Sequence, residues 1–541
     1  MRLINLVIFL LSTFTIINSQ PDSRFRPFDW VLYHGPGEIK SLSEGYNYIY
    51  IATKNGGIKR FNIYNLTFDE PITIAQGLES NNVSAIHFDS ETGYIWAATP
   101  NHIQYSFSRE GDWFSIEIKS LGLSDYDEVK KIGSSVGYIW IQLRSSYAKL
   151  SHSSGSLVGI YSIPDEVSIN WSSGPFTNQN ELSEIFMNYS ISDGWIYSGN
   201  DLIDPLGRRV TMTTGFIGKY GNVYAGTDDG TFFHASEVMQ NFTPMIPDIT
   251  NFAVSSMYKD GDKIWIGSPN YVNSKGISWT NPWSKQFGSY LFEETINMTP
   301  TPIFSLTAEG DELWAGGDNL LLFYDQKKDY WRTFGEEIGI PSGQLWSLHR
   351  DDSHIWVGSS NGISRISRST KREDPIGIEY IFHENPIYDI EEYQDDIWIG
   401  ARSGIFVYSK SSPQLKNGME LGRKSFAENM IRITAIKEHN GEMYIVGDMG
   451  IAKFDFDKSE WELLFNSVTY QSRTVYSLAL KKNNIFLGTD DGIVRINQKT
   501  GFIKDYSFSF IGQVNEIIVE DKVLWAATNN GLIKFKWKRD L

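Results

Sequence analysis

The chain contains no cysteine in its 541 residues. Disulfide bonds and a lipid-modified cysteine are therefore excluded, and the fold has to be stable without covalent cross-links. Positive charge is also scarce, since 48 Lys and Arg stand against 65 Asp and Glu and give a net charge of −17. The one basic run is the short segment 534–539. Nucleic acid and anionic membrane surfaces would be repelled by such a chain, so neither is an expected partner.

Motifs of familiar catalytic and metal-binding chemistry are missing as well. The nine histidines are scattered, and only His349 and His354 are close, on either side of an expected turn. Paired aspartates recur at 228–229, 351–352, 395–396 and 490–491, in expected hairpin turns where Asp bonds its own backbone. No Gly-rich phosphate loop and no Cys or His nucleophile arrangement occurs. We therefore expect no catalytic residue, no metal site and no cofactor.

Long hydrophobic runs are absent except at the beginning of the chain. Residues 3–17 are almost wholly apolar, follow Arg2 and lie just before the small residue Ser19. This pattern predicts a signal peptide at residues 1–19, because the run is shorter than the ~20 apolar residues of a membrane-spanning helix. We expect export to the periplasm, the cell surface or the medium, without membrane insertion after the signal is cleaved.

What the chain does contain is a hairpin pattern that is repeated twelve times along the sequence. The stretch DIWIGARSGIFVYS, residues 396–409, returns as YIYIATKNGGIKRF at Tyr50, HIWVGSSNGISRI at Trp356 and NIFLGTDDGIVRI at Phe486. Most successive copies lie 39–49 residues apart, which is about the length of one four-stranded propeller blade. Weaker copies centre on Trp140, Tyr197, Trp265 and Trp314.

Each copy predicts four short strands with an aromatic residue in the second. Gly follows that aromatic by six residues in seven copies, as a tight hairpin turn with positive φ prefers. A lone sheet of this kind cannot bury both faces, whereas sheets packed radially can. We expect an all-β fold of tandem β-propellers with about twelve blades. The aromatic residues expected between blades are Tyr50, Trp96, Trp140, Tyr224, Trp265, Trp314, Trp356, Trp398, Tyr444, Phe486 and Trp525.

The connections between copies carry a second signature. AQGLESNNVSAIHF (75–88) and IGIPSGQLWSLHR (338–350) share a Gly-Leu or Gly-Ile, a polar step and an apolar strand. Joined to the hairpin, these connections resemble the two-component-regulator propeller repeat of bacterial hybrid sensor kinase ectodomains, over almost all of residues 28–541. A weaker similarity points to the propeller component of the type IX secretion system. The sequence ends at Leu541 after an expected third strand, so we expect a free-standing relative without kinase or membrane helix.

Twelve blades exceed the 4–8 that are typical of one ring, so two rings are expected. The stretch FDWVLY (28–33) resembles a fourth strand and GLIKFKW (531–537) a third strand, which predicts strand exchange between the termini. We favour six plus six blades, with propellers at 24–283 and 284–541. In that arrangement residues 28–33 complete the Trp265 blade, and a strand near 285–292 completes the Trp525 blade. The alternative pairs residues 28–33 with the Trp525 blade and gives seven plus five.

The turns between second and third strands are the expected binding surface, because in a propeller they surround the channel on one face. Examples are TKNGG (53–57), ARSG (401–404), TDDG (489–492) and TNNG (528–531), which differ while their strands stay nearly constant. A rigid frame with variable tips suits recognition. The expected ligand-binding residues are Lys54, Arg402, Asp490 and Asn529, and the two cations would suit an anionic or polyhydroxylated ligand. A Ser-, Asn- and Gly-rich insertion at 153–183 is an alternative location.

A non-catalytic exported binding or assembly module, with a protein or carbohydrate ligand, is therefore the expected function. The alternative is a propeller-fold lyase or hydrolase that acts on a polysaccharide or an ester. Such enzymes gather ionisable side chains from several blades in one channel, so three or more buried ionisable groups converging there would favour the enzyme. Trp171, Trp279, Trp283 and Trp346 are not needed between blades, and for each of them packing is preferred to a role as a sugar platform.

Overall fold

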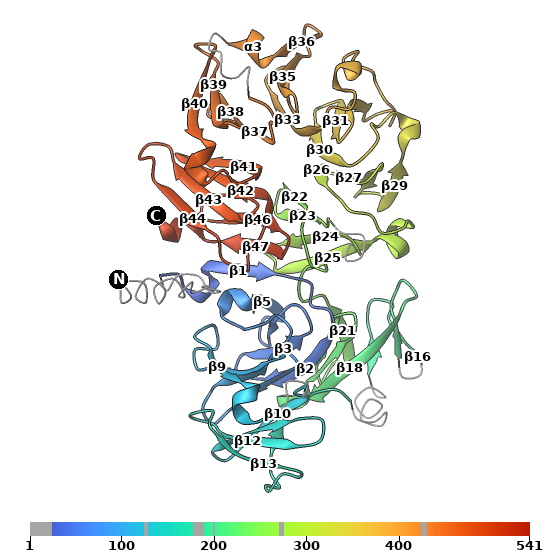
Figure 1. The fold of residues 1–541 in the computed structure, drawn as a ribbon. Coiled ribbons are helices and arrows are strands. Elements are labelled where there is room, and N and C mark those ends of the chain that lie inside the picture. The colour runs from blue at the N-terminus through green and yellow to red at the C-terminus, as the bar shows by residue number, and fades with distance from the viewer. Residues whose placement is uncertain (1–23, 124–127, 177–188, 199–200, 270–274, 423–429) are drawn as a thin grey trace, which may run out of the picture.

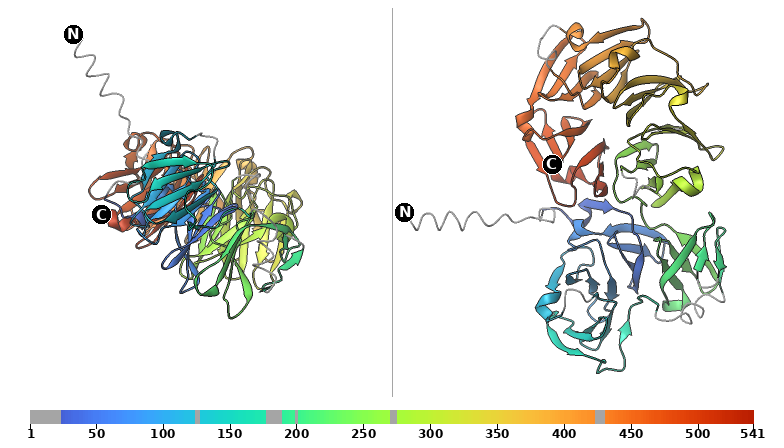
Figure 2. Two further views of the ribbon diagram at one scale, coloured as in Figure 1. Left: turned by 90° about the horizontal axis from the view of Figure 1, so that it is seen from below. Right: turned by 45° about the vertical axis from the view of Figure 1, so that its right-hand side comes forward.

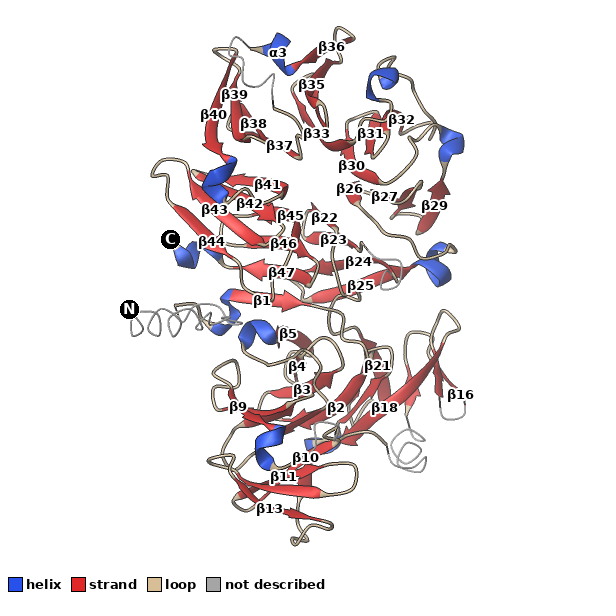
Figure 3. Ribbon diagram, in the orientation of Figure 1, coloured by secondary structure: helices blue, strands red, loops and turns tan. Residues whose placement is uncertain are grey.

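The computed structural model of the chain describes residues 24–123, 128–176, 189–198, 201–269, 275–422 and 430–541. The signal peptide expected at residues 1–19 lies outside the described residues, as does the end of the 153–183 segment. Strands dominate the fold, and helix occurs as short turns (Figure 3). The α-helical turn α3 (Gly418–Leu421) and the π-helical turn Phe292–Ile296 are examples. In the described part of the chain, no helix has the length and apolarity to cross a membrane.

The strands of the described residues form eleven sheets, most of them four-stranded and antiparallel. The expectation of an all-β fold built from such sheets is therefore confirmed, and the arrangement is that of a β-propeller. Figures 1 and 2 show the sheets in two groups that meet where the chain begins and ends. The first group runs from blue to green along the colour bar, and the second from green to red.

The second group contains seven sheets whose first strands lie at the centre. Consecutive first strands contact one another, and the last contacts the first, so the seven sheets surround a common centre. Their strands are β22 (Ser256–Asp260), β23 (Lys263–Gly267), β24 (Gly276–Asn281), β25 (Gln286–Leu291), β26 (Ser305–Glu309), β27 (Glu312–Gly316), β28 (Leu321–Asp325), β29 (Tyr330–Phe334), β30 (Leu345–Arg350), β31 (His354–Ser359), β32 (Gly362–Ser367), β33 (Ile387–Tyr393), β34 (Asp396–Ala401), β35 (Gly404–Ser409) and β36 (Gln414–Asn417). They continue with β37 (Ala435–His439), β38 (Glu442–Gly447), β39 (Gly450–Asp455), β40 (Glu460–Asn466), β41 (Val475–Lys481), β42 (Asn484–Thr489), β43 (Gly492–Asn497), β44 (Ile503–Tyr506), β45 (Val514–Val519), β46 (Leu524–Thr528) and β47 (Gly531–Phe535).

The N-terminal strand completes the last sheet of this second group. Strand β1 (Trp30–Tyr33) pairs antiparallel with β47, with Trp30 opposite Phe535, and the two lie side by side in Figure 1. The favoured pairing of residues 28–33 with the Trp265 blade is therefore wrong. The same holds for the strand near 285–292, because β25 pairs with β24 of its own sheet. The boundary expected at 283/284 therefore falls inside that sheet, because β24 and β25 pair with each other as a hairpin on either side of it.

The first group contains four sheets around a second centre. Their strands are β2 (Ile39–Glu44), β3 (Tyr48–Thr53), β4 (Ile58–Asn62), β5 (Thr67–Ile72), β6 (Ala85–Phe88), β7 (Ile95–Ala98), β8 (His102–Ser106), β9 (Phe114–Glu117), β10 (Lys131–Ser135), β11 (Tyr138–Gln142), β12 (Tyr147–Ser151), β13 (Leu157–Tyr161) and β14 (Asn170–Trp171). The fourth sheet contains β15 (Ser190–Ile191), β16 (Ile196–Ser198), β17 (Asp201–Ile203), β18 (Arg209–Ile217), β19 (Val223–Thr227), β20 (Phe232–Ala235) and β21 (Asn241–Met245).

Two of the twelve expected copies share this fourth sheet. Tyr197 lies in β16 and Tyr224 in β19, and both strands belong to one seven-stranded sheet. Tyr197 is 40% exposed, whereas Tyr224 is 1% exposed. The separate blade expected at Tyr197 is therefore not formed. The reason is chain length, because the 27 residues between the two positions are too few for four strands and their turns.

The eleven aromatic residues expected between blades are all buried, with exposed fractions of 3% or less. Trp398 is typical. It packs with Met443 and Ile445 of the next sheet and with the ring of Trp461. Each ring of this size removes roughly 150–250 Å² from water, so the repeated aromatic holds one sheet against the next.

The Gly that recurs in the hairpin copies of this chain has a steric cause. Gly492 has φ +84°, and a Cβ atom there would lie 2.1 Å from the carbonyl oxygen of Tyr506 on the neighbouring strand. Positive φ also occurs at Gly230, Gly362, Gly404, Gly450 and Gly531. In the Tyr50 copy the positive φ is at Gly57 instead of the expected Gly56.

A buried ion pair joins the two groups of sheets. Lys59 of β4 bonds to Asp248, which lies in the connection between β21 and β22, and the two side chains are 1% and 0% exposed. The Asp248 carboxylate also accepts from the backbone N–H of His34 and Ile249. The contact between the two groups of sheets therefore depends on a buried ion pair, and backbone N–H groups bond to the carboxylate of that pair as well.

Candidate functional site

The centre of the second group is lined by one equivalent position in each of its seven sheets. Register shifts in β30, β33, β41 and β45 leave Trp346, Tyr388, Tyr476 and Asn515 out of the ladder. In the other three sheets the equivalent residues are Ser255, Phe304 and Thr434, which immediately precede the first ladder residue. A bulge bends the strand and redirects a side chain, and all seven side chains line the same cavity.

This cavity has two connected levels. The mouth has a volume of about 990 Å³, and a deeper cavity of about 490 Å³ is lined by the same seven residues and by the first strands below them. A mouth of this size is in the range of small-molecule sites. We call the two levels together the channel.

Aromatic rings form one part of the mouth. The rings of Trp346 and Tyr388 are stacked, with centroids 5.6 Å apart and an interplanar angle of 6°. Trp346 Nε1 donates to Gln344 Oε1 at 3.1 Å, which fixes the indole. Tyr476, on another sheet, is 39% exposed. Its partial burial raises the pKa of its hydroxyl, and the nearby Asp490 charge adds a smaller rise. The rings offer flat apolar faces to an occupant of the mouth.

Amide side chains form another part of the mouth. Gln513 Nε2 donates to Asn515 Oδ1 at 2.8 Å, and Asn515 Nδ2 donates to Asn529 Oδ1 at 3.1 Å. Asn530 lines the cavity beside them. Each of these bonded amide side chains has a donor or an acceptor lone pair left over, because a carboxamide has two N–H donors and two lone pairs on its oxygen.

Two carboxylates occupy a position that is usually serine. Directly after the mouth position, four of the seven sheets have Ser256, Ser305, Ser347 and Ser477, and the fifth has Ala435. Ser305 Oγ donates to the Leu345 carbonyl of the next sheet at 2.8 Å. The remaining two sheets have Asp389 and Glu516 instead, and both side chains line the deeper cavity.

These carboxylates bond to the next sheet and make no ion pair within the described residues. Asp389 Oδ2 accepts from Ile436 N–H at 2.7 Å, and Glu516 Oε2 accepts from Met257 N–H at 2.6 Å. Lys437 bonds both oxygens of Glu391 at 2.9 Å. Burial raises the pKa of Asp389 to about 6, and the Glu391 charge adds to that rise. Burial raises the pKa of Glu516 to about 7, opposed by its bond to Met257 N–H.

The residues expected to bind a ligand are placed differently from one another. Asn529 lines the mouth. The turns that carry Arg402 and Asp490 adjoin it, because Arg402 O accepts from Arg432 N–H and Asp490 N–H donates to Thr474 O, and Arg432 and Thr474 line the cavity. Lys54 lies in the β3–β4 turn of the first group, so the structure does not bring it together with the other three.

The side chains that line the channel most fully are not evident from the repeat pattern. The pattern marks Trp346 as unnecessary between blades, but it does not single out Tyr388, Tyr476, Asp389 or Glu516. A usable signal was present in the aligned first strands: IFSL (303–306), LWSL (345–348), IYDI (387–390), VYSL (475–478) and VNEI (514–517). The second column of this alignment faces the mouth, and the third faces the deeper cavity.

The other residues considered for chemistry have structural roles. His349 contacts Glu392 at 3.2 Å and His354 contacts Asp374 at 2.9 Å. Asp351 accepts from the backbone of its own turn and from Trp356 Nε1 at 2.9 Å. Within the described ranges, no group of three or more His, Asp or Glu side chains could hold a metal ion.

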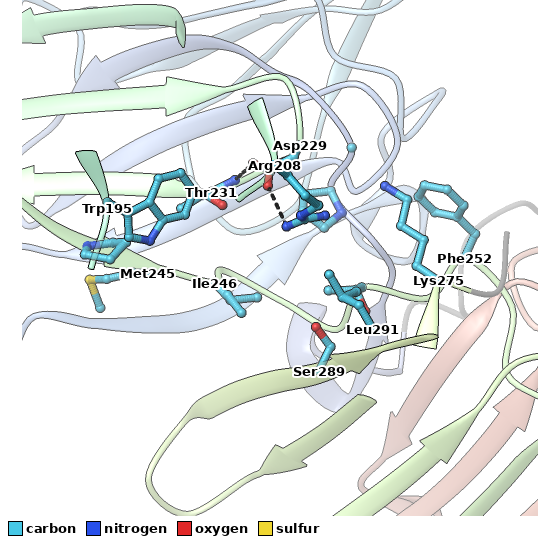
Figure 4. Close-up of a pocket in the computed structure, with 15 residues that line it drawn as sticks. Trp195, Arg208, Asp229, Thr231, Met245, Ile246, Phe252, Lys275, Ser289 and Leu291 are labelled. Carbon is cyan, nitrogen blue, oxygen red and sulfur yellow. Dashed lines mark hydrogen bonds and ion pairs between the residues drawn. The ribbon is translucent and has the colours of Figure 1, made fainter. Parts of the chain in front are cut away.

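A smaller cavity of about 240 Å³ lies where the two groups of sheets meet. Figure 4 shows Trp195, Met245 and Ile246 toward one side of it and Arg208 beside Asp229. Arg208 is engaged by Asp204 at 2.8 Å, Glu294 at 3.6 Å and Asp229 at 3.7 Å. Because one guanidinium serves three carboxylates, this cavity has no cation from Arg208 to offer an anionic ligand.

Comparisons with known proteins find distant structural likeness only. No protein-family model matches the chain, and no curated protein sequence matches it. Among solved structures, it is similar to the extracellular domains of the hybrid two-component systems BT4673 and BT3049 of B. thetaiotaomicron. The BT4673 domain is 12% identical with a TM-score of 0.43, over 92% of this chain and 70% of that one. The BT3049 domain is 17% identical with a TM-score of 0.42, over 92% and 75%.

These two neighbours come from the group of proteins that the hairpin repeat resembles. Virginiamycin B lyase from Staphylococcus aureus is also similar, at 16% identity and a TM-score of 0.42, over 52% of this chain and 94% of that one. At these identities and TM-scores, no ligand, partner or activity carries over to this chain.

Proposed function

We propose that the protein is an exported, non-catalytic binding module whose channel mouth takes a carbohydrate ligand. We further infer that the seven sheets of the second group form one propeller ring, which holds the mouth residues in place. The observation that carries the proposal is the stacked pair Trp346 and Tyr388 at the edge of a cavity of about 990 Å³. Aromatic faces pack against the C–H surfaces of a sugar ring, and fixed amides bond its hydroxyl groups.

The amide chain of the mouth supports a polyhydroxylated ligand more than an anionic one. Gln513, Asn515 and Asn529 are neutral and are held by bonds to one another, so their free donors and acceptors are oriented in advance. One cation, Arg432, lines the mouth, and it is exposed to solvent. Screening weakens the pull of such an exposed charge on an anion.

The test is a screen of neutral oligosaccharides against the full-length protein, followed by titration calorimetry with those that bind. Trp346→Ala and Tyr388→Ala are expected to weaken binding at least tenfold and to leave the melting temperature within a few degrees. Trp283→Ala is the matched control, because Trp283 is 78% exposed and does not line the channel. Binding that survives both mouth variants, or is lost equally in the control, would exclude this site.

A second candidate is the propeller-fold lyase or hydrolase, and a specific observation favours it. Asp389, Glu391 and Glu516 are partly buried and line the deeper cavity together with the exposed Lys437, so ionisable groups gather in one channel although fewer than three of them are fully buried. Carboxylates with pKa values of about 6 and 7 suit general acid–base chemistry near neutral pH. Product formation from a bound polysaccharide or ester, abolished by Glu516→Gln, would establish this function in place of simple binding.

A further inference from the structure

We propose that the ligand of the channel carries a basic amine, whose ammonium group binds between the aromatic rings of the mouth and the carboxylates of Asp389 and Glu516. The inference rests on the carbohydrate-binding function proposed above and narrows its ligand to amino-bearing sugars. Three independent features support it: the replacement of serine by acid at two equivalent positions, the charge of the deeper cavity, and the aromatic rings above it.

The two acids are not required to join neighbouring sheets. Ser305 makes the equivalent sheet-to-sheet contact through one hydroxyl bond, and the sheet of Ala435 forms with no polar side chain at this position. Asp389 and Glu516 make a similar contact through one oxygen to a backbone N–H of the next sheet, and the other oxygen of Asp389 accepts from the N–H of Ile390 at 2.9 Å. No hydrogen bond to Glu516 Oε1 from any described residue is present, so this oxygen is left for an occupant of the channel.

The deeper cavity has an excess of negative charge. Its lining includes two lysines, Lys259 and Lys437, and four acids, Asp389, Glu391, Glu438 and Glu516, so the acids outnumber the lysines by two. Both lysines are already engaged, Lys437 by Glu391 and Lys259 by Glu520. A carboxylate enclosed without a counter-charge is costly. A cationic occupant would lower that cost, whereas a neutral or anionic one would not.

The mouth above these acids also favours a cation. The faces of Trp346, Tyr388 and Phe304 lie on three successive sheets around the cavity, and an aromatic face attracts an ammonium group through its quadrupole. The exposed Arg432 is at the rim and not in the deeper cavity. A ligand that enters through the mouth therefore passes from aromatic faces to two carboxylates that make no ion pair within the described residues. This order suits an amine attached to a flat sugar ring.

The direction of the pH dependence follows from the groups that face these acids. Glu391 and Lys437 act on Asp389, and Asp389 and Lys437 act on Glu516. Both acids have pKa values above their ordinary range, so they are anionic at pH 8 and largely protonated at pH 5. A primary alkylamine stays protonated throughout, since its pKa is roughly that of lysine. Preference for the amine should therefore be present at pH 8 and be lost as the pH falls through 7 and 6.

The experiment is a ligand-observed NMR titration of the full-length protein with matched pairs of methyl hexosides. Each pair consists of a 6-amino-6-deoxy sugar and its 6-hydroxy parent, in the gluco, galacto and manno series. At pH 8 we expect at least one amino sugar to bind tenfold or more tightly than its parent, and at pH 5 we expect the ratio to fall below threefold. The double variant Asp389→Ser, Glu516→Ser should remove the preference at pH 8.

The choice of serine keeps the variant folded, because serine is the residue at four of the seven equivalent positions. Circular dichroism and the melting temperature check this. The control is Glu237→Ser, Asp457→Ser, which changes the net charge by the same amount at two exposed positions outside the channel and should keep the preference.

The failure of this inference is distinguishable from the failure of the proposed function. Equal binding of amino and parent sugars, both weakened by Trp346→Ala, would overturn the amine inference and leave the carbohydrate function standing. A preference that persists in the serine double variant would also overturn it. If neither member of any pair binds, the carbohydrate function falls and the amine inference falls with it.

Discussion

Replacement of Trp30 by alanine tests how the chain closes on itself. Trp30 lies in β1 with an exposed fraction of 0%, and its indole stacks on Phe535 of β47 at 3.7 Å with an interplanar angle of 9°. Tyr506, Phe508 and Phe510 surround it with centroids 5.5–5.8 Å away. The strand that begins the chain is therefore held by aromatic rings from its last sheets, more than 470 residues later.

The magnitude follows from the cavity that the substitution leaves. Truncation of a buried Trp to Ala typically costs about 3–5 kcal/mol. No hydrogen bond is lost in addition, because Trp30 Nε1 has no partner among the described residues. The penalty should appear mainly as local opening of β1 from β47, where four residue pairs join the strands. A loss of 3 kcal/mol in that opening equilibrium corresponds to about a hundredfold faster amide exchange.

Native-state hydrogen exchange measured by mass spectrometry provides the assay, since a chain with several sheets need not unfold in one step. Peptides that cover β47 (Gly531–Phe535) should exchange at least about a hundredfold faster in Trp30→Ala, while peptides that cover β23 (Lys263–Gly267) stay as in the parent. Trp283→Ala, at an exposed position, should change neither. Unchanged exchange in β47, or faster exchange in β23 alone, would refute the pairing of β1 with β47.

Two further substitutions test the hairpin turn and the joint between the groups of sheets. Gly492→Ala should cost about 1–3 kcal/mol of unfolding free energy in urea titration, because its φ is +84° and the added Cβ meets a carbonyl oxygen at 2.1 Å. Gly501→Ala is the control, with φ +69° and open space around its Cβ position, and it should cost less. Equal costs for the two substitutions would contradict the steric reason. Lys59→Ala should cost about 3–5 kcal/mol by leaving Asp248 charged and buried, and Lys59→Met with Asp248→Leu should melt close to the parent. A single Lys59 variant as stable as the parent would show that the joint does not depend on the pair.

The sequence predicted the repeated part of the fold well, because that part depends on local pattern. The hairpin at Trp398 combines an apolar strand, a Gly with positive φ and an aromatic residue that a neighbouring sheet covers, and the residues that carry these signals all lie within 396–409. The prediction of a separate blade at Tyr197 from the same local pattern was wrong. The weak match there belongs to a hairpin that extends the sheet of Tyr224. There the short spacing was a better guide than the aromatic residue.

Closure of the rings could not be decided from local pattern. The stretch that contains β1 fits the fourth-strand position of any sheet that lacks one, and the candidates at Trp265 and Trp525 are more than 200 residues away from it in sequence. What decides between them is the packing of Trp30 against Phe535 and Tyr506, which are residues of sheets that the sequence alone does not place side by side. Long-range pairing of this kind leaves no periodic trace.

The channel was difficult to predict for a different reason. Turns vary visibly, whereas Tyr388 and Tyr476 are single positions inside strands whose neighbours are apolar. Such residues look like core until a bulge turns them out of the ladder. The register shifts that do so are seen only when the strands are paired. Of the four expected ligand-binding residues, Asn529 alone lines the mouth among the described residues.

The described part of the insertion at 153–183 distinguishes the centre of the first group from that of the second. Its strand β14 pairs with β10, and Ser173 then bonds to Leu42 of β2 and to Thr214 of β18. Three of the first group's central strands are thus bridged by one inserted segment. The equivalent central positions of the second group are bridged by no such segment in the described residues, and their side chains face the channel. The chain therefore braces the central strands of one set of sheets with an inserted segment, whereas the equivalent side chains of the other set line the channel.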